Sequence, residues 1–171
     1  MGDPHNLARV GETWNLERIE AQLAEIHAVT SASPIISGGW AWHFMSPTHR
    51  EVKIFHDHSD IDLFIDGVNF YTFRTCVTSR GFKRVKTKYD SLSFMRYTKF
   101  LDTGKVVFDT YIQSAPFVVA NGQRVVAPKH LLSLYKTTHQ SRECVAVQAA
   151  KRLVADGKEV VGHPSLVGES G

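Results

Sequence analysis

The sequence contains few cysteines and no long hydrophobic run. Cys76 and Cys144 are the only two, and they form no CxxC pair and no disulfide framework. We expect both to be reduced thiols in or near the core, in a cytoplasmic setting. No stretch approaches the roughly 18 apolar residues of a membrane span, and the N-terminal segment lacks the apolar core of a signal peptide. These absences argue against a disulfide-rich secreted domain and against a membrane partner.

Internal repeats, low-complexity blocks and linkers are also absent. The 171 residues, 43% hydrophobic and 22% charged, have the composition of a globular protein of one domain. We expect an irregular lead-in at residues 1–13, a single domain at 14–156 and a flexible tail at 157–171.

Charge is mildly basic, with a net charge of +3 and a pI of about 8.9. This suits a nucleotide or nucleic acid but is shared by many unrelated proteins. The densest basic group alternates with apolar residues, which favours the solvent-exposed face of a strand over a binding patch. Its members are Arg80, Lys83, Arg84, Lys86 and Lys88.

Hydrophobic spacing predicts an α/β (α+β) domain: a mixed sheet of about five strands flanked by helices, with a helical pair at the C-terminal end. The expected helices cover residues 14–29, 40–45, 70–79, 128–137 and 141–153. One expected strand ends at 35–36, and four others cover 60–66, 82–88, 93–100 and 105–113. A hairpin turn is expected at 102–104, and a further small hairpin is expected from 117–120 and 123–126.

A pair of glycines follows the first expected strand. In Ser37-Gly38-Gly39 the backbone enters a helix without side chains, so that a phosphate can approach the N–H groups and the positive end of the helix dipole. By itself this pattern is also typical of an ordinary strand-to-helix turn.

Two carboxylates stand two residues apart at the start of the next strand. Residues at this spacing project from the same face, so Asp60 and Asp62 lie side by side. Adjacent carboxylates repel each other, and a site that keeps both ionised usually holds a cation. Mg²⁺ prefers carboxylates together with substrate phosphates. A solvated edge strand is the alternative, but the apolar run at 63–65 favours a central strand.

A third acid interrupts the apolar strand at 105–113. Buried without a partner, Asp109 would be costly. It either completes a cluster with Asp60 and Asp62 that binds two metal ions ~3.5–4 Å apart, or forms a salt bridge with a nearby Lys or Arg. The cluster accounts for all three acids at once.

The two segments together resemble the signature of the DNA polymerase β-like nucleotidyltransferase superfamily, with closest similarity to the aminoglycoside, lincosamide and toxin-type enzymes. The matching segments are Ser37-Gly38-Gly39-Trp40-Ala41 and His58-Ser59-Asp60-Ile61-Asp62-Leu63. A later segment, 127–136, resembles the helix that follows the sheet in these enzymes. The spacer between Gly39 and Asp60 is slightly longer than in those relatives.

The resemblance implies transfer of a nucleoside monophosphate from an NTP such as ATP to a hydroxyl acceptor, with release of pyrophosphate. Asp60 and Asp62 would bind two Mg²⁺ ions, with Mn²⁺ as an alternative, and Asp109 would be the third acid and the base. The remaining residues implied to contact the nucleotide are Ser37, Gly38, Gly39, His58, Ser59 and Lys136.

Two other functions fit the same residues. A nucleotide- or nucleic-acid-binding module without catalysis could keep the fold, although binding alone needs none of the three acids. His56, Asp57 and His58 also allow a metal-dependent hydrolase, but no later histidine-rich strand completes a zinc site. The acceptor stays open among a small molecule, RNA and a protein, and a homodimer with a shared acceptor site is consistent with the chain length.

Overall fold

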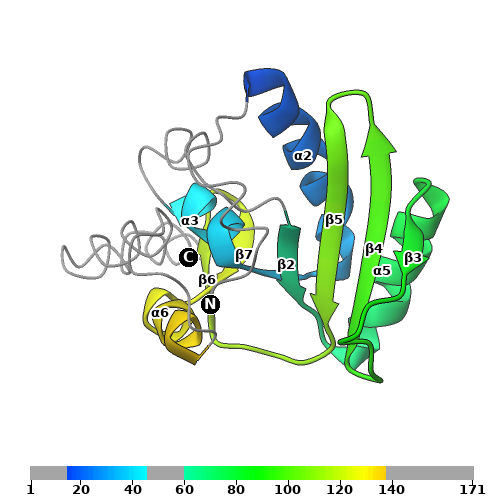
Figure 1. The fold of residues 1–171 in the computed structure, drawn as a ribbon. Helices are drawn as coiled ribbons and strands as arrows, with labels where there is room; N and C mark the ends of the chain where they lie inside the picture. The colour runs from blue at the N-terminus through cyan, green and yellow to red at the C-terminus, as the bar shows by residue number, and fades with distance from the viewer. Residues whose placement is uncertain (1–14, 46–59, 138–171) are drawn as a thin grey trace.

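The computed structural model describes residues 15–45 and 60–137 (Figure 1). The elements follow in the order α2 (Leu16–Ala28), η1 (Thr30–Ala32), β1 (Ile35–Ser37), α3 (Gly38–Met45), β2 (Asp60–Phe64), α5 (Gly67–Ser79), β3 (Lys83–Val85), β4 (Phe94–Leu101), β5 (Gly104–Tyr111), β6 (Phe117–Ala120), β7 (Gln123–Val126) and α6 (Pro128–Thr137). The predicted helix at 141–153, the lead-in at 1–13, the tail and Cys144 lie outside the described residues.

One mixed sheet contains all the described strands, in the order β3-β4-β5-β2-β1-β7-β6. β2 pairs with β5 and β1 pairs with β7 in parallel, and the other neighbours are antiparallel. The predicted class is confirmed, but the described sheet has seven strands and not about five. The difference arises because the β6–β7 hairpin joins the sheet through β1, a long-range pairing that no local pattern reveals.

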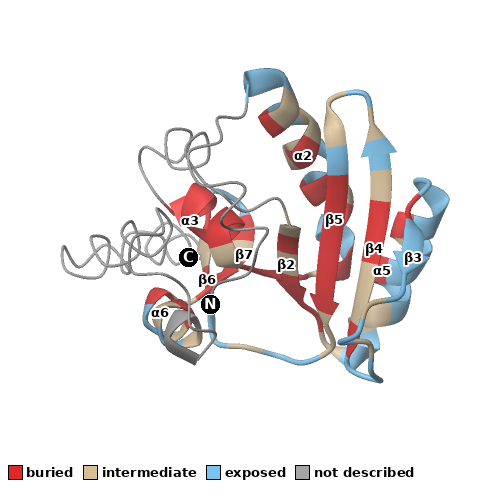
Figure 2. Ribbon diagram, viewed as in Figure 1, coloured by how far each residue is buried: buried red, intermediate tan, exposed pale blue. Residues whose placement is uncertain are grey.

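Helices α2 and α5 cover one face of the sheet, behind β5 and β4 in the view of Figure 1. Phe73 of α5 makes edge contacts with Tyr97 of β4 and Phe108 of β5, at centroid distances of 5.8 and 5.7 Å. Ile19 and Ile26 bring the buried stripe of α2 to the same core, which Figure 2 shows as a continuous buried layer. Each such side chain stabilises the fold by roughly 1.5–3 kcal/mol.

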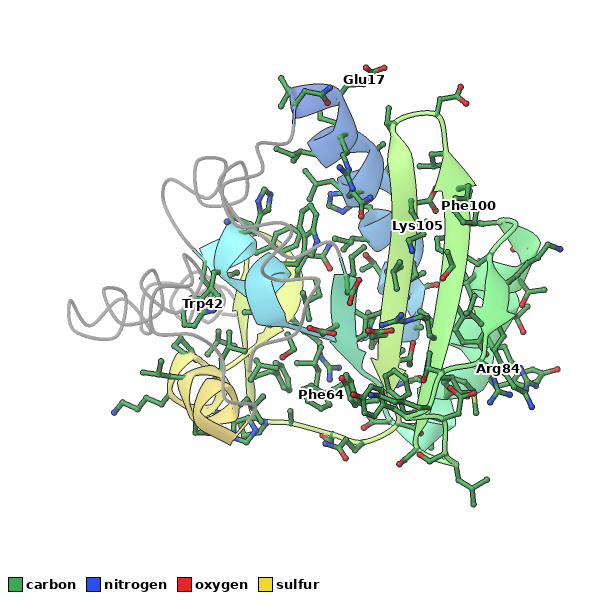
Figure 3. The ribbon with its side chains drawn as sticks, viewed as in Figure 1. Glu17, Trp42, Phe64, Arg84, Phe100 and Lys105 are labelled. Carbon is green, nitrogen blue, oxygen red and sulfur yellow. The ribbon has the colours of Figure 1, made fainter. Side chains whose placement is uncertain are left out.

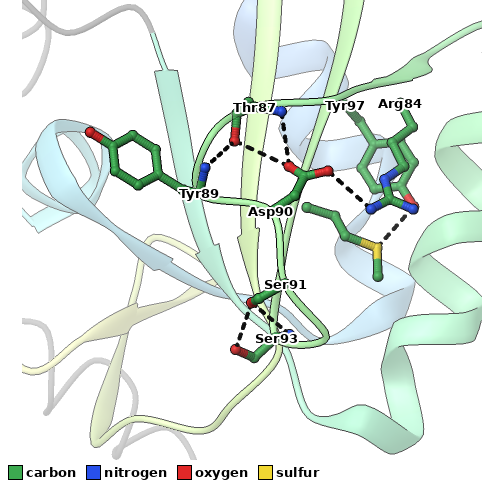
Figure 4. A network of polar contacts seen from close by, with 8 residues as sticks. Arg84, Thr87, Tyr89, Asp90, Ser91, Ser93 and Tyr97 are labelled. Carbon is green, nitrogen blue, oxygen red and sulfur yellow. Dashed lines mark hydrogen bonds and ion pairs between the residues drawn. The ribbon is translucent and has the colours of Figure 1, made fainter.

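The β3–β4 connection is held by a small polar network (Figure 4). The Asp90 carboxylate accepts hydrogen bonds from the Thr87 backbone N–H and hydroxyl and from Arg84, each at 3.1 Å. All three residues of β3 are exposed, as predicted for this basic segment. The strand is shorter than predicted because the turn around Asp90 begins soon after Val85.

A buried carboxylate joins α2 to two other elements. Glu25 is 4% exposed and pairs with Arg80, after α5, at 2.8 Å and with Lys99 of β4 at 2.9 Å. Burial opposes its ionisation, but the hydrogen bonds and charges of these two cations outweigh burial and lower the pKa of Glu25. The ionised carboxylate therefore stabilises the helix-covered side of the sheet.

Replacing Glu25 by Gln is expected to destabilise the protein by about 2 kcal/mol at pH 7, because two cations lose their partner. The folded-state pKa lies below the ordinary value of 4.5, so this difference persists above pH 4.5 and shrinks as the pH falls through the lowered pKa. Urea denaturation at several pH values measures it. Glu20→Gln, at an exposed position of the same helix, is the matched control, and equal losses in both variants would contradict the assignment.

Candidate active site

Three carboxylates lie on one face of two neighbouring strands. The parallel pairing of β2 with β5 places Asp62 opposite Asp109 and Asp60 opposite Val107. Because side chains two apart share a face, Asp60 and Asp62 project beside Asp109, and neighbouring strands are about 4.8 Å apart. The structure thus brings together the three acids that the sequence singled out, on the face opposite α2 and α5.

The predicted glycine pair adjoins this row of acids. β1 runs antiparallel to β2 and places Ser37 opposite Asp62. Gly38, the first residue of α3, has a φ of +65°, and a Cβ added there would lie 2.6 Å from Oδ2 of Asp62. Only glycine satisfies both conditions, since the backbone is left-handed and the carboxylate already fills the space. The start of α3, including buried Gly39, is therefore fixed against a carboxylate.

A cation that sequence reasoning missed lies beside the acids. Arg96 of β4 donates two hydrogen bonds to Asp109, from Nε to Oδ1 at 2.7 Å and from Nη2 to Oδ2 at 2.9 Å, and its Nη2 lies 3.5 Å from Oδ2 of Asp60. This salt bridge is the alternative that the sequence left open for Asp109. The sequence does contain a feature that predicts this pair: a hairpin turn at 102–104 fixes the register of the two strands, and that register pairs Arg96 with Asp109.

Burial and the negative charges of the acids together raise the pKa of groups in this row. Burial raises the pKa of Asp109 and the charge of Asp60 adds to this, while the Arg96 guanidinium acts against both. Burial, followed by the charges of Asp62, Asp109 and Asp60, raises the pKa of Tyr111. A site in which nearby groups resist a further negative charge favours a bound cation.

Aromatic rings close one end of the acid row. Tyr111 follows Asp109 by two residues on β5 and therefore shares its face. Its ring lies 5.4 Å from that of Phe64, at the end of β2, and 5.0 Å from that of Phe94, at the start of β4. Figure 3 shows Phe64 at this end of the sheet. Phe64 and Phe94 are buried, so this end of the acid row is closed by packed aromatic side chains.

Three predicted nucleotide contacts are not placed. His58 and Ser59 lie outside the described residues, as do His49 and His56. Lys136 belongs to α6, a helix confirmed at its predicted bounds, but its side chain is not among those described.

The oxygen donors suit a hard divalent cation, although the described residues contain no group of three or more His, Cys, Asp or Glu side chains arranged to hold one. Asp60 and Asp62 present adjacent carboxylates, and Asp62 lies against the backbone of Gly38 at the start of α3, where the positive end of the helix dipole favours an anion beside the ion. Both oxygens of Asp109 are engaged by Arg96. The residues fit a cation held mainly by Asp60 and Asp62.

Two solved structures share this arrangement of helices and strands. One is ANT(2″)-Ia, an aminoglycoside nucleotidyltransferase solved in complex with adenylyl-2″-tobramycin, with a TM-score of 0.54, 15% identity and coverage of 88% of this chain and 99% of that one. The other is the Megavirus polyadenylate synthase, with a TM-score of 0.52, 11% identity and coverage of 80% of this chain and 31% of that one. The chain has the nucleotidyltransferase fold.

The resemblance inferred from the two short motifs is thus confirmed at the level of the fold. No protein-family model and no curated protein matches the chain by sequence. Among the described residues, no helix has the length and apolar character needed to cross a membrane. Within this fold, Asp60, Asp62 and Asp109 lie on one face of the sheet, with Gly38 against Asp62.

Replacing Gly38 by Ala should destabilise the protein by clearly more than the roughly 1–2 kcal/mol of a left-handed backbone, because Asp62 must also move. Gly122 has a φ of +80° with nothing within 4 Å of an added Cβ, so Gly122→Ala is the control for the backbone cost alone. Thermal unfolding of the two variants compares these costs. Equal shifts in Tm would show that Asp62 does not restrict position 38.

Arg96 and Asp109 are expected to couple by about 2 kcal/mol in a double-mutant cycle built from Arg96→Met and Asp109→Asn, because each single change leaves a polar group without its partner. Denaturant unfolding of the four proteins gives the coupling energy. The solvent-exposed pair Arg84–Asp90 serves as the comparison and should couple more weakly. Additive single changes at Arg96 and Asp109 would disprove a structural ion pair.

Proposed function

We propose that the protein is a metal-dependent nucleotidyltransferase, which transfers a nucleoside monophosphate from an NTP to a hydroxyl acceptor. The observation that carries this proposal is the contact between Gly38 and Asp62 within the row of three acids. A carboxylate pair, a backbone without Cβ and the start of a helix meet at one point. This combination suits a triphosphate accompanied by a divalent cation.

In the proposed transfer, one P–O bond forms and another breaks. The acceptor oxygen attacks the α-phosphorus of the NTP, a new P–O bond forms, the bond from the α-phosphorus to the bridging oxygen of the β-phosphate breaks, and pyrophosphate leaves. Asp60 and Asp62 would hold a divalent cation, which would supply activation of the hydroxyl and neutralisation of charge on the phosphates. Asp109, a carboxylate whose pKa is raised by burial, would take the hydroxyl proton.

Each remaining residue has a task that follows from its position. Asp60 and Asp62 would hold the cation. Gly38 and Gly39 would offer backbone N–H groups to the triphosphate, and the helix dipole of α3 would favour the same anion. Arg96 keeps Asp109 and Asp60 close together, because without it the three like charges would repel one another.

One observation favours a second candidate, a nucleotide-binding module without catalysis. Both oxygens of Asp109 are bound by Arg96, as in a purely structural salt bridge. In such a module the acids would still lie beside the nucleotide, but no pyrophosphate would be released. The hydrolase alternative rests on His56 and His58, outside the described residues.

Asp60→Asn together with Asp62→Asn is expected to abolish the Mg²⁺-dependent thermal stabilisation by NTP and to reduce transfer by at least about a hundredfold, because the cation loses both charged ligands. A thermal shift assay with each NTP, and incubation with each α-labelled NTP and cell extract, measure the two effects.

Asp102→Asn, at the exposed β4–β5 turn, is the matched control and should behave as the wild type. A metal-dependent shift that persists in the double variant would refute the assignment of the acids. A wild-type protein that is stabilised by NTP and Mg²⁺ but labels no product with any NTP would support the binding module.

A further inference from the structure

The face that carries the acids continues across β4 to the edge of the sheet. The register aligns Val85 and Arg96 with Asp109, and Lys83 with Thr98. Phe100 pairs with Lys105 on the same face, since Phe100 is four residues from Arg96 along β4 and Lys105 is four residues from Asp109 along β5. The outer strands thus extend the surface that holds the candidate site, on the side away from α2 and α5.

An aromatic ring stands in solvent on this extension. Phe100 is 79% exposed, and its direct cross-strand neighbour is Lys105, which is also exposed. Figure 3 shows the two side by side on neighbouring strands. Lys105 is four residues from Asp109 along β5, or about 13 Å at 3.3 Å per residue. An extended ligand that contacts Phe100 therefore has to span about 13 Å to reach Asp109.

The charge beside this ring is positive. We define the basic margin as the two exposed lysines of this face that form no ion pair with any described residue: Lys83 and Lys105. The neighbouring arginines are engaged, Arg84 by Asp90 and Arg96 by Asp109. The described acids nearby are Asp90, already paired, and Asp102 in the hairpin turn.

We propose that this surface binds the acceptor, and that the acceptor is a single-stranded nucleic acid. The inference rests on the proposed transferase function and names the substrate class of its acceptor. Phosphates contact the basic margin, a base stacks on the exposed face of Phe100, and the terminal hydroxyl lies at Asp60, Asp62 and Asp109. Lysines combined with exposed rings are the pattern by which proteins hold single strands without reading their sequence.

Charge separates this acceptor from the other classes. A polycationic small molecule would be repelled by the two lysines of the basic margin, which form no ion pair with a described acid. An acidic peptide would satisfy the lysines but gives no reason for a solvent-exposed ring beside them. In the reaction, the terminal hydroxyl oxygen bonds to the α-phosphorus of the NTP, pyrophosphate leaves, and the strand grows by one nucleotide.

The test measures binding separately from catalysis. Fluorescence anisotropy follows labelled single-stranded RNA and DNA of about 12 nucleotides, within the range of known site sizes, in EDTA and at 50–200 mM salt. Lys83→Gln with Lys105→Gln should weaken binding about fivefold or more and make the salt dependence shallower by about 1.4 in log–log slope, since two phosphate contacts are lost. Phe100→Ala should weaken binding by about fivefold or more.

Arg74→Gln is the matched control, because Arg74 is an exposed cation of α5 on the opposite face of the sheet. It should bind as the wild type. The lysine and Phe100 variants should keep the thermal stabilisation by NTP and Mg²⁺, which shows that they remain folded and that the donor site is intact. A preference for RNA or for DNA would identify the type of strand that is bound. Equal binding would show that the protein does not distinguish them, and each of these results supports the proposal.

Three outcomes would overturn it. If the wild-type protein is stabilised by NTP and Mg²⁺ but binds neither RNA nor DNA, the proposed transferase function stands and the proposed nucleic-acid acceptor is refuted. Binding that is weakened as much by Arg74→Gln as by the lysine changes places the contact elsewhere. Polyglutamate that competes as well as RNA assigns the surface to an acidic protein. Strand binding without any stabilisation by NTP and Mg²⁺ instead refutes the transferase function, and with it the role as acceptor.

Discussion

The parallel pairing of β2 with β5 is the constraint on which the candidate site depends. It places Asp62 opposite Asp109, and the strands on either side continue the same row with Ser37 on β1 and Arg96 on β4. Like charges are therefore held together by backbone hydrogen bonds that do not yield to their repulsion. The rest of the site follows from this row: a glycine where a carboxylate fills the space, and a guanidinium where carboxylates meet.

β4 supplies cations to both faces of the sheet. Because its side chains alternate, Arg96 projects to the acid row and Lys99 to the helix-covered face, where it meets Glu25. One strand thus pairs with a carboxylate of the candidate site and with a carboxylate of the helix-covered face. The two ion pairs differ in setting: Arg96 contacts two acids of the candidate site, whereas Lys99 and Arg80 surround an acid packed between elements.

Local patterns in the sequence predicted what local forces determine. The acids of β2, the glycine at the start of α3 and the β4–β5 turn each follow from the residues present, and their positions agree with the structure. The full extent of the sheet was missed, because it depends on which strands become neighbours. Arg96 was missed although the β4–β5 turn fixes the register that places it opposite Asp109. Alternation says which face a residue takes, but not which residue lies across from it.

The connection between β2 and β5 also has a consequence for how the molecule forms. Parallel neighbours cannot be joined by a tight turn, and here the chain passes through α5, β3 and β4 before β5 returns beside β2. The β4–β5 hairpin closes a short loop, whereas the pairing of β2 with β5 must offset the entropy of a long one. Loop-closure entropy therefore favours formation of the Arg96–Asp109 pair within the local hairpin over the long-range approach of Asp60 and Asp62.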